Sequence, residues 1–460
     1  MRSWLVACFQ FAFAAFAEPG DGSAGDFTVS GTTVVNRYGP LRASVEAGAR
    51  TLETTPGLVG AGDLVLLLTA QSATPLSNDG DTIRVDDANV GRFATARVEA
   101  MSGSTITLTA PLERAWDATV TQVVFVPQYE NLTIEAGGVI EPLPWDGQVG
   151  GVVALAVRGT LTNEGRVHAD GRGFRGGRGG LVDVAPFPSE LIRNGEGLVA
   201  GSWPALRNPL PDSTGGAIGR FFQAYSVTPG GGGGNATRGG KAPFAKDASG
   251  GTGGLRVSSA GERALFGGGA AATGQGSHLF TEPGGAGGGA VIVFAGAVAG
   301  AGTFSANGLA GGTTQTNGDD PLVPNVRHTA AGAGGSIVLD VLGSITCSLV
   351  DASGGDGQSV KGCCAASAAG GAGRIFVTAK SLACETRAVS GLTGTFDSQQ
   401  RDGFPFTRLA GEVDVRELAR APKEATTPKF LVGCSVGSGD LLWLSLAALL
   451  FQRRTRNVSN

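Results

Sequence analysis

Four aspartates have the side-chain type that sugar hydrolysis requires, and two of them lie on apolar, alternating stretches. The four are Asp170, Asp340, Asp351 and Asp356. Hydrolysis of a glycosidic bond uses two carboxyl groups about 5–9.5 Å apart. On strands with period two, Asp340 and Asp351 point outward, where they either line one groove or simply face solvent. Ordinary polar alternation is the preferred interpretation, so the sequence predicts no catalytic residue and a protein that is not an enzyme.

A second acidic run offers oxygen ligands to a hard cation such as calcium. It consists of Asp79, Asp81, Asp86 and Asp87. The run lacks both the EF-hand spacing and the repeated GGxGxDx signature of calcium-binding β-helices. We interpret it as a solvated loop, and we expect no metal and no cofactor.

The segment GRGFRGGRGG imitates an RNA-binding motif through Arg172, Arg175 and Arg178. The net charge of −4 argues against nucleic acid as a partner. We therefore expect these arginines to form local ion pairs in a flexible turn.

Histidine and tryptophan give weaker signals. The histidines are scattered along the chain, with no Ser/His/Asp or Cys/His grouping: His168, His278 and His328. Three tryptophans are either exposed platforms on which a sugar stacks or buried turn residues: Trp116, Trp145 and Trp203.

Four cysteines fall within 38 residues: Cys347, Cys363, Cys364 and Cys384. Four cysteines permit three pairings. The neighbours Cys363 and Cys364 rarely bond to each other because the geometry is strained. We therefore expect Cys347 and Cys384 each to pair with one of them, as suits an exported protein. Zinc is the alternative, but C-x-x-C spacing and a nearby histidine are both missing.

Both ends carry targeting signals. Residues 1–17 have a basic start, an apolar run and an A-x-A site, which predicts a signal peptide cleaved after Ala17. Residues 421–433 form a linker that contains the polar, Pro-bounded stretch Pro422 to Pro428. The tail 434–460 begins at Cys434 and contains the apolar run Leu441 to Phe451, which is followed by three arginines, Arg453, Arg454 and Arg456. An 11-residue run is short for a spanning helix, which needs about 20. The tail is thus either processed at Cys434 or retained in the membrane.

The elements that must position these residues are strands. The chain has 78 glycines, which disfavour a helical bundle, and 42 % hydrophobic residues, which suffice for a core. Short alternating stretches predict a small β-barrel or sandwich over residues 27–149, with a hairpin turn at Ser102-Gly103-Ser104.

A repeat follows, and its four units share a Gly turn, a strand and a small-x-Gly ending. The units are Gly150–Gly171, Gly288–Gly308, Gly334–Gly354 and Gly371–Gly391. Such a period predicts a Gly-rich parallel β-helix over residues 150–420, in which each unit stacks on the next. A Greek-key sandwich is the alternative. The insertion 172–287 is either disordered or packed as tight loops on the solenoid.

The body of the chain resembles the glycine-rich surface proteins of myxobacteria and other gliding bacteria, some of them labelled "adventurous gliding motility protein". The matching motifs are VPQYENLTI, PWDGQVGG, GRVHADGRGFRGG, GEG and GGGGGN. The tail, with Gly-Cys-Ser, an apolar stretch and an Arg cluster, is similar to the myxobacterial C-terminal sorting signal. The resemblance implies an exported envelope component and implies no catalytic residue.

Together these features predict an all-β, non-catalytic protein of the cell surface or outer membrane, or a secreted one, with a structural, adhesive or gliding-motility role. Its expected partners are envelope or extracellular polysaccharides or proteins, and the membrane through its tail. The alternative is a secreted polysaccharide-active β-helix enzyme or a glycan-binding module.

Overall fold

The computed structural model describes most of the chain between residues 19 and 418. The described ranges are 19–86, 88–178, 194–200, 214–217, 220–221, 227–228, 230–242, 248–249, 251–259, 261–272, 274–275, 283–315, 326–358, 367–394 and 408–418. These residues form strands, turns and extended segments. None of their segments is a helix with the length and apolar character needed to cross a membrane. The predicted signal peptide, Cys434 and the apolar run of the tail lie outside these ranges.

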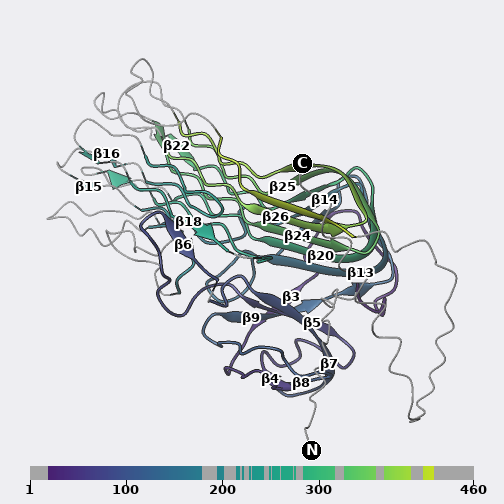
Figure 1. Ribbon diagram of the computed structural model, residues 1–460. Helices are drawn as coiled ribbons and strands as arrows, with labels where there is room; N and C mark the ends of the chain where they lie inside the picture. The colour runs from purple at the N-terminus through teal and green to yellow at the C-terminus, as the bar shows by residue number, and fades with distance from the viewer. Residues whose placement is uncertain are drawn as a thin grey trace, which may run out of the picture. The chain divides into compact units, whose positions relative to one another are not determined.

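A 14-stranded sheet, in which every pair of neighbouring strands is parallel, winds into a β-helix (Figure 1). In chain order its strands are β1 (Phe27–Val29), β2 (Thr32–Thr33), β10 (Gln128–Tyr129), β11 (Leu132–Ile134), β12 (Val139–Ile140), β13 (Val152–Asn163), β14 (Arg166–His168), β20 (Ala290–Ala299), β21 (Thr303–Ser305), β24 (Ser336–Val341), β25 (Ser344–Asp351), β26 (Arg374–Ala379), β27 (Ser381–Arg387) and β28 (Glu412–Glu417). The predicted fold class is therefore confirmed.

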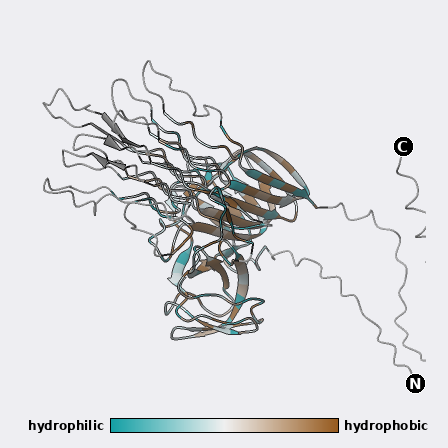
Figure 2. Cartoon of the chain, turned by 60° about the vertical axis from the view of Figure 1, so that its left-hand side comes forward, coloured by the Kyte–Doolittle hydropathy of each residue, from teal (hydrophilic) through white to brown (hydrophobic). Residues whose placement is uncertain are grey.

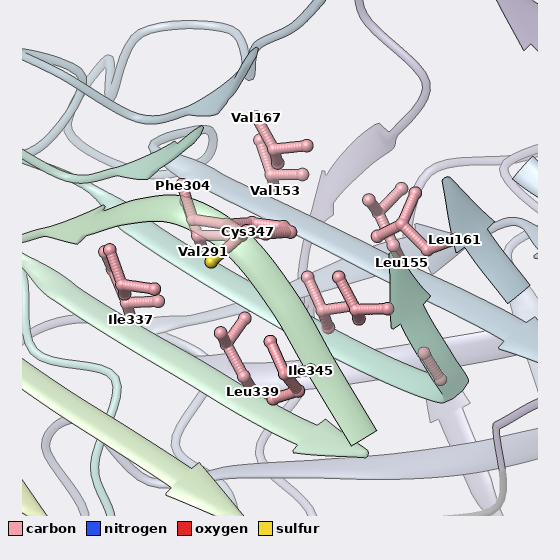
Figure 3. Packing of buried hydrophobic residues seen from close by; sticks show 14 of the residues in the cluster. Val153, Leu155, Leu161, Val167, Val291, Phe304, Ile337, Leu339, Ile345 and Cys347 are labelled. Carbon is pink, nitrogen blue, oxygen red and sulfur yellow. The ribbon is translucent and has the colours of Figure 1, made fainter. Parts of the chain in front are cut away.

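The four repeat units are consecutive coils of this solenoid, as predicted. Val167 of the first unit lies opposite Phe304 of the second, which lies opposite Val350 of the third. Equivalent apolar residues of each coil point inward and stack, for example Val153 and Val291 (Figure 3). Each such buried side chain contributes about 1.5–3 kcal/mol. Figure 2 shows this concentration of apolar residues along the parallel strands.

An antiparallel module interrupts the solenoid between its first two coils. Its six-stranded sheet has the order β3-β9-β5-β7-β8-β4 and contains the predicted hairpin β7–β8. The strands are β3 (Arg37–Pro40), β4 (Thr51–Glu53), β5 (Leu64–Thr69), β7 (Phe93–Ser102), β8 (Thr105–Leu108) and β9 (Thr121–Val126). Strand β5 is buried on both faces, because Val65 and Leu67 enter the core of the module while Leu66 and Leu68 pack on the outer face of the solenoid.

The predicted boundary of this module, residues 27–149, differs from the structure. Strands β1, β2 and β10–β12 belong to the parallel sheet, so the module occupies only the stretch from β3 to β9. Short alternating strands have the same period in both sheets, and the period alone does not distinguish them.

Two side-chain amides of the module close the edge of β13. The amide of Asn36 donates to the carbonyl oxygen of Ala154 (2.7 Å) and accepts from its N–H (3.1 Å). Gln122 bonds in the same two-way fashion to Gly150 (3.0 and 2.9 Å). Each amide thus imitates a paired strand, and an edge that otherwise attracts other chains is occupied.

Beyond β14, β21, β25 and β27 the chain leaves the parallel sheet in Gly-rich arms and returns to start the next coil. The arms are the described parts of residues 169–289, 306–335, 352–373 and 388–411. Short ladders lie along them: β15 (Arg220–Phe221) with β17 (Ala248–Ser249), β16 (Val227–Thr228) with β19 (Gly274–Gln275), and β22 (Thr313–Gln315) with β23 (Val326–His328). A further ladder joins β18 (Arg256–Ser258) of an arm to β6 (Thr82–Arg84), which lies between β5 and β7 in the chain. In Figure 1 the arms run from the parallel sheet toward β15, β16 and β22.

The arms bind one another through backbone hydrogen bonds that recur every three residues. Along Gly231–Gly234, the first and fourth N–H groups donate to segment 214–217, the second to segment 239–242 and the third to segment 330–333. The same recurrence holds along 267–271, 284–288 and 331–335. Three residues per turn without internal hydrogen bonds is the geometry of a polyproline-II-type helix. The arms therefore form a bundle of such helices.

Glycine is needed in this bundle because the backbones approach closely. A Cβ on Gly232 would overlap the carbonyl oxygen of Ala369, and a Cβ on Gly332 would overlap that of Ala286. Of the two expectations for the insertion 172–287, its described residues agree with packing: they pack on one another as extended arms, and Leu265 and Phe266 pack on the outer face of the solenoid.

Candidate functional site

A row of polar residues lies at the ends of strands β12, β14, β21, β25 and β27, which follow one another in successive coils. In each unit the small residue of the small-x-Gly ending, such as Ala169 or Ala306, faces the solenoid core. Its neighbours therefore face away from the core and stack from coil to coil. We call this set the polar ladder: Glu141, His168, Asp170, Ser305, Asn307, Asp351, Ser353 and Arg387.

Asn307 joins the two aspartates of the ladder, Asp170 and Asp351. Asp170 accepts hydrogen bonds from the backbone N–H of Asn307 (2.6 Å) and from the hydroxyl of Ser305 (2.8 Å). The Asn307 amide donates to Asp351 (3.3 Å), which also accepts from the Arg387 guanidinium (Nε, 3.1 Å). Both carboxylates are thus held by donors from their own chain.

The structure brings together two of the four predicted carboxylates, Asp170 and Asp351. They lie on coils separated by one intervening coil, which corresponds to about 10 Å. Asn307 of the intervening coil contacts both, Asp170 through its backbone N–H and Asp351 through its side-chain amide, where a hydrolase would need the sugar or a water. Asp351 is only 3 % exposed. The arrangement locks the register of three coils.

His168 belongs to the same ladder, although the scattered histidines of the sequence predicted no such grouping. Its Nε2 lies 3.4 Å from Glu141, and its Nδ1 lies 3.7 Å from Asp170. Burial lowers the pKa of His168; Asp170 and Glu141 act in the opposite direction, and the charges of two nearby arginines lower it further. The nearby Ser305 hydroxyl donates to Asp170 and not to the imidazole, so the order nucleophile, base and acid is not formed. Alignment of His168 with Ser305 across the repeats was the available signal.

Asp340 and Asp356 lie apart from the ladder. Asp340 occupies the outer face of β24, in register with Phe294 and Thr378. Asp340 and Asp351 therefore do not pair as the predicted acids of one groove. Asp356 lies in an arm, where it binds Arg408 (3.0 Å).

Near Asp340 the structure places an acid that sequence reasoning missed. Burial raises the pKa of Glu262, and the charge of Asp340 raises it further; Arg416 acts in the opposite direction. Asp414 of β28 adds a third carboxylate to this outer acidic cluster. Glu262 lies within the Gly-rich insertion, where no strand pattern marked it. Two carboxyl groups, one of them held toward its protonated form, are a pattern of acid–base catalysis.

Residues of three sequence motifs, PWDGQVGG, GRGFRGG and GEG, meet at one buried carboxylate, that of Glu196. Glu196 of the GEG motif is 2 % exposed and accepts hydrogen bonds from Arg175 (Nε, 2.9 Å) and from the indole N–H of Trp145 (3.1 Å). Gln71 of the antiparallel module adds a bond of 3.3 Å. Removing one partner of such a buried pair costs about 3–5 kcal/mol. These motifs therefore join the module, the solenoid and the arms.

The structure also tests what was predicted for the arginines and the tryptophans. Arg172 and Arg175 do form ion pairs, with Glu141 (2.6 Å) and Glu196, although these partners are distant in sequence. Trp116 and Trp145 are 1 % and 3 % exposed, so neither is a sugar-stacking platform. Trp203, His278 and the side chain of His328 lie outside what the structure describes.

The disulfide joins Cys347 to Cys384, so the predicted pairing of each with Cys363 or Cys364 is wrong. Cys363 and Cys364 lie outside the described residues. Cys347 and Cys384 occupy neighbouring strands β25 and β27, and their Cα atoms are 4.9 Å apart, which matches the spacing of adjacent strands. Both are the fourteenth residue of their repeat unit, so the repeat alignment held the signal.

The acidic run near residue 80 makes turn and ion-pair contacts. Backbone N–H groups of Asp81 and Thr82 donate to Asp79 and lower its pKa. Asp81 pairs with Arg238 (2.7 Å). Within the described ranges, which exclude Asp87, no group of three or more His, Cys, Asp or Glu side chains is placed to hold a metal ion.

No protein-family model matches this chain, and no curated protein matches it. Among solved structures it is similar to three phage tailspikes. The tailspike gp61 of Pseudomonas phage phi297 is 15 % identical over 31 % of this chain and 24 % of its own, with a TM-score of 0.18. The tailspike gp49 of Pseudomonas phage LKA1 is 14 % identical over 31 % and 28 %, with a TM-score of 0.17. This chain therefore spans about a quarter of their length.

The Gp54 tailspike of Acinetobacter baumannii bacteriophage AP22, solved with an A. baumannii capsular saccharide, is 9 % identical over 85 % of this chain and 65 % of its own, with a TM-score of 0.17. At TM-scores this low, the three similarities carry no argument about activity or ligand.

Proposed function

We propose that this chain is a non-catalytic, exported surface protein whose β-helix and arm bundle form a rigid scaffold with a structural or adhesive role. The carrying observation is the period-three hydrogen bonding between the arms, which ties segments far apart in sequence into one backbone-bonded body. A body held by backbone groups places little demand on outward side chains, which suits a protein that displays contact surface. Gliding motility is one setting for such a role.

The polar ladder supports a non-catalytic role. Asp170 and Asp351 bind Asn307, Ser305 and Arg387, so neither carboxylate is presented to a substrate. The Cys347–Cys384 disulfide supports export, because such bonds persist in oxidising compartments. Export by the signal peptide, attachment through the tail and partners in the envelope complete this proposal.

Surface proteolysis of intact cells of the source organism, with mass spectrometry of the mature termini, tests the location. We expect cleavage in intact cells, a new N-terminus after Ala17 and either a C-terminus near Cys434 or a retained tail. A protected, unprocessed cytoplasmic chain would contradict the proposal.

A secreted polysaccharide-active enzyme is the second candidate, and the outer acidic cluster is the observation that favours it. In that function Glu262 would donate a proton and Asp340 would act as the second carboxyl group. The test measures reducing ends released from bacterial surface polysaccharides by the full chain, by Glu262→Gln and by Glu130→Gln, an exposed control. Release that depends on Glu262 alone would replace the first proposal by the second.

A further inference from the structure

Strand β28 is the last described strand of the solenoid, and within the described ranges it pairs only with β26. Val413 and Val415 of this strand lie in register with Ile375 and Val377 of β26. Those two residues are 0 % and 1 % exposed and belong to the solenoid core. Val413 and Val415 occupy the same inward positions but are 43 % and 42 % exposed, because no further coil among the described residues covers them.

Among the described residues, nothing pairs with the backbone of β28 on the same side. The N–H groups of Glu412 and Leu418 donate to carbonyl oxygens on the β26 side (3.3 and 2.8 Å). Hydrogen-bonding direction alternates along a strand, so the N–H and C=O groups of Val413, Val415 and Glu417 point away from β26. Within the described ranges no strand pairs with that edge. Such an edge is a template for another strand.

We propose that this edge binds the β28 strand of a second copy of this chain, antiparallel and around a two-fold axis through Val415. A two-fold contact uses the same surface on both copies, and it closes after two subunits. The outward groups of Val415 then bond to those of the partner's Val415, and each Val413 lies opposite the partner's Glu417 on the inward face of the joined sheet.

The charges of the strand select this register. With the axis at Val415, each Asp414 lies opposite Arg416 of the other copy, so two opposite-charge pairs form and no like charges meet. An axis at Val413 places Glu412 opposite Asp414. Axes at Asp414 or Arg416 place that residue opposite itself, and like charges directly opposite one another destabilise a sheet. Asp414 and Arg416 are 36 % and 59 % exposed and pair within their own chain (2.6 Å), so they are available at this edge.

Charge-reversal variants of the full chain test the contact, with molar mass measured by light scattering after size exclusion. The wild type is expected to be a dimer. Asp414→Arg alone places arginines opposite each other, and Arg416→Asp alone places aspartates opposite each other. Each variant alone is therefore expected to dimerise at least tenfold more weakly. A mixture of the two restores opposite charges in both pairs and is expected to recover the dimer.

The matched control reverses an exposed pair far from this edge, Glu130 and Arg158, singly and in mixture. These variants are expected to remain dimeric. Circular dichroism checks that all variants are folded. A monomeric wild type, dimers that survive both single reversals, a mixture without recovery, or open-ended multimers formed by head-to-tail stacking would each overturn the proposal.

Discussion

Replacing Gly232 by alanine tests whether backbones in the arm bundle are in contact. The Gly232 N–H donates to the carbonyl oxygen of Gly240 (3.0 Å), and the Gly240 N–H donates to that of Ala369 (2.8 Å). The added Cβ overlaps the carbonyl oxygen of Ala369, which is backbone and cannot rotate away. Overpacking costs about 1–3 kcal/mol, and loss of one hydrogen bond costs about 1 kcal/mol. Alanine also restricts the unfolded chain, which offsets about 0.4–1 kcal/mol of this loss of stability. We therefore expect the free energy of unfolding to fall by about 1–3.5 kcal/mol.

The matched control is Gly31→Ala. Gly31 has no described heavy atom within 4 Å of its added Cβ, and its φ lies outside the left-handed region. The same chemical change there is expected to leave stability unchanged or raise it slightly. Urea unfolding of both variants measures the difference, and hydrogen exchange of peptides covering residues 230–242 locates it. Equal stability of the two variants, or unchanged exchange in the arms, would refute close packing of the bundle.

Three further outcomes are expected. Asn307→Ala removes the hydrogen bond to Asp351 and leaves the Ser353 N–H without its acceptor. We expect the free energy of unfolding in urea to fall by about 1–3 kcal/mol. The control is Asn89→Ala, which should change stability little because Asn89 is exposed and makes one hydrogen bond of 3.3 Å. Because the pKa of Glu262 is raised in the fold, the wild type should lose stability as pH rises from 4.5 through that raised pKa, whereas Glu262→Gln should not; identical pH profiles of urea midpoints would exclude this. Cys347→Ser opens a loop with a sequence separation of 37 and should cost about 3–4 kcal/mol; no change in thermal or urea stability would argue that the bond does not form.

The sequence was most informative where side chains repeat. The aligned endings Val167-Ala169-Gly171 and Phe304-Ala306-Gly308 predicted both the coils and their register, because inward residues must stack at strand spacing. The polar ladder follows from the same alignment. The predicted pairing of Cys347 is wrong because the adjacency of Cys363 and Cys364 does not indicate which strands stack. Cys347 and Cys384 share one position of the repeat, and this places them on neighbouring strands.

The structure of the arms could not be predicted in this way. Glycine has no side chain, so Gly231–Gly234 shows no periodic pattern that distinguishes three-fold hydrogen bonding from a flexible linker. Glu262 was missed for a related reason, since its neighbour Asp340 is 78 residues away and only the packing of an arm on β24 brings their charges together.

In most solenoids, folding starts in one repeat and propagates to the next, because each repeat contacts only its neighbours. The arms of this protein connect distant coils instead. The N–H of Gly233, in the arm between β14 and β20, donates to Ala331, and its carbonyl oxygen accepts from Gly371, which precedes β26. An early part of the chain therefore cannot complete its bonding until much later parts have been synthesised. Shortening the chain from its C-terminus should consequently melt the middle of the molecule as well as its end, and the coils and arms should unfold in one cooperative step.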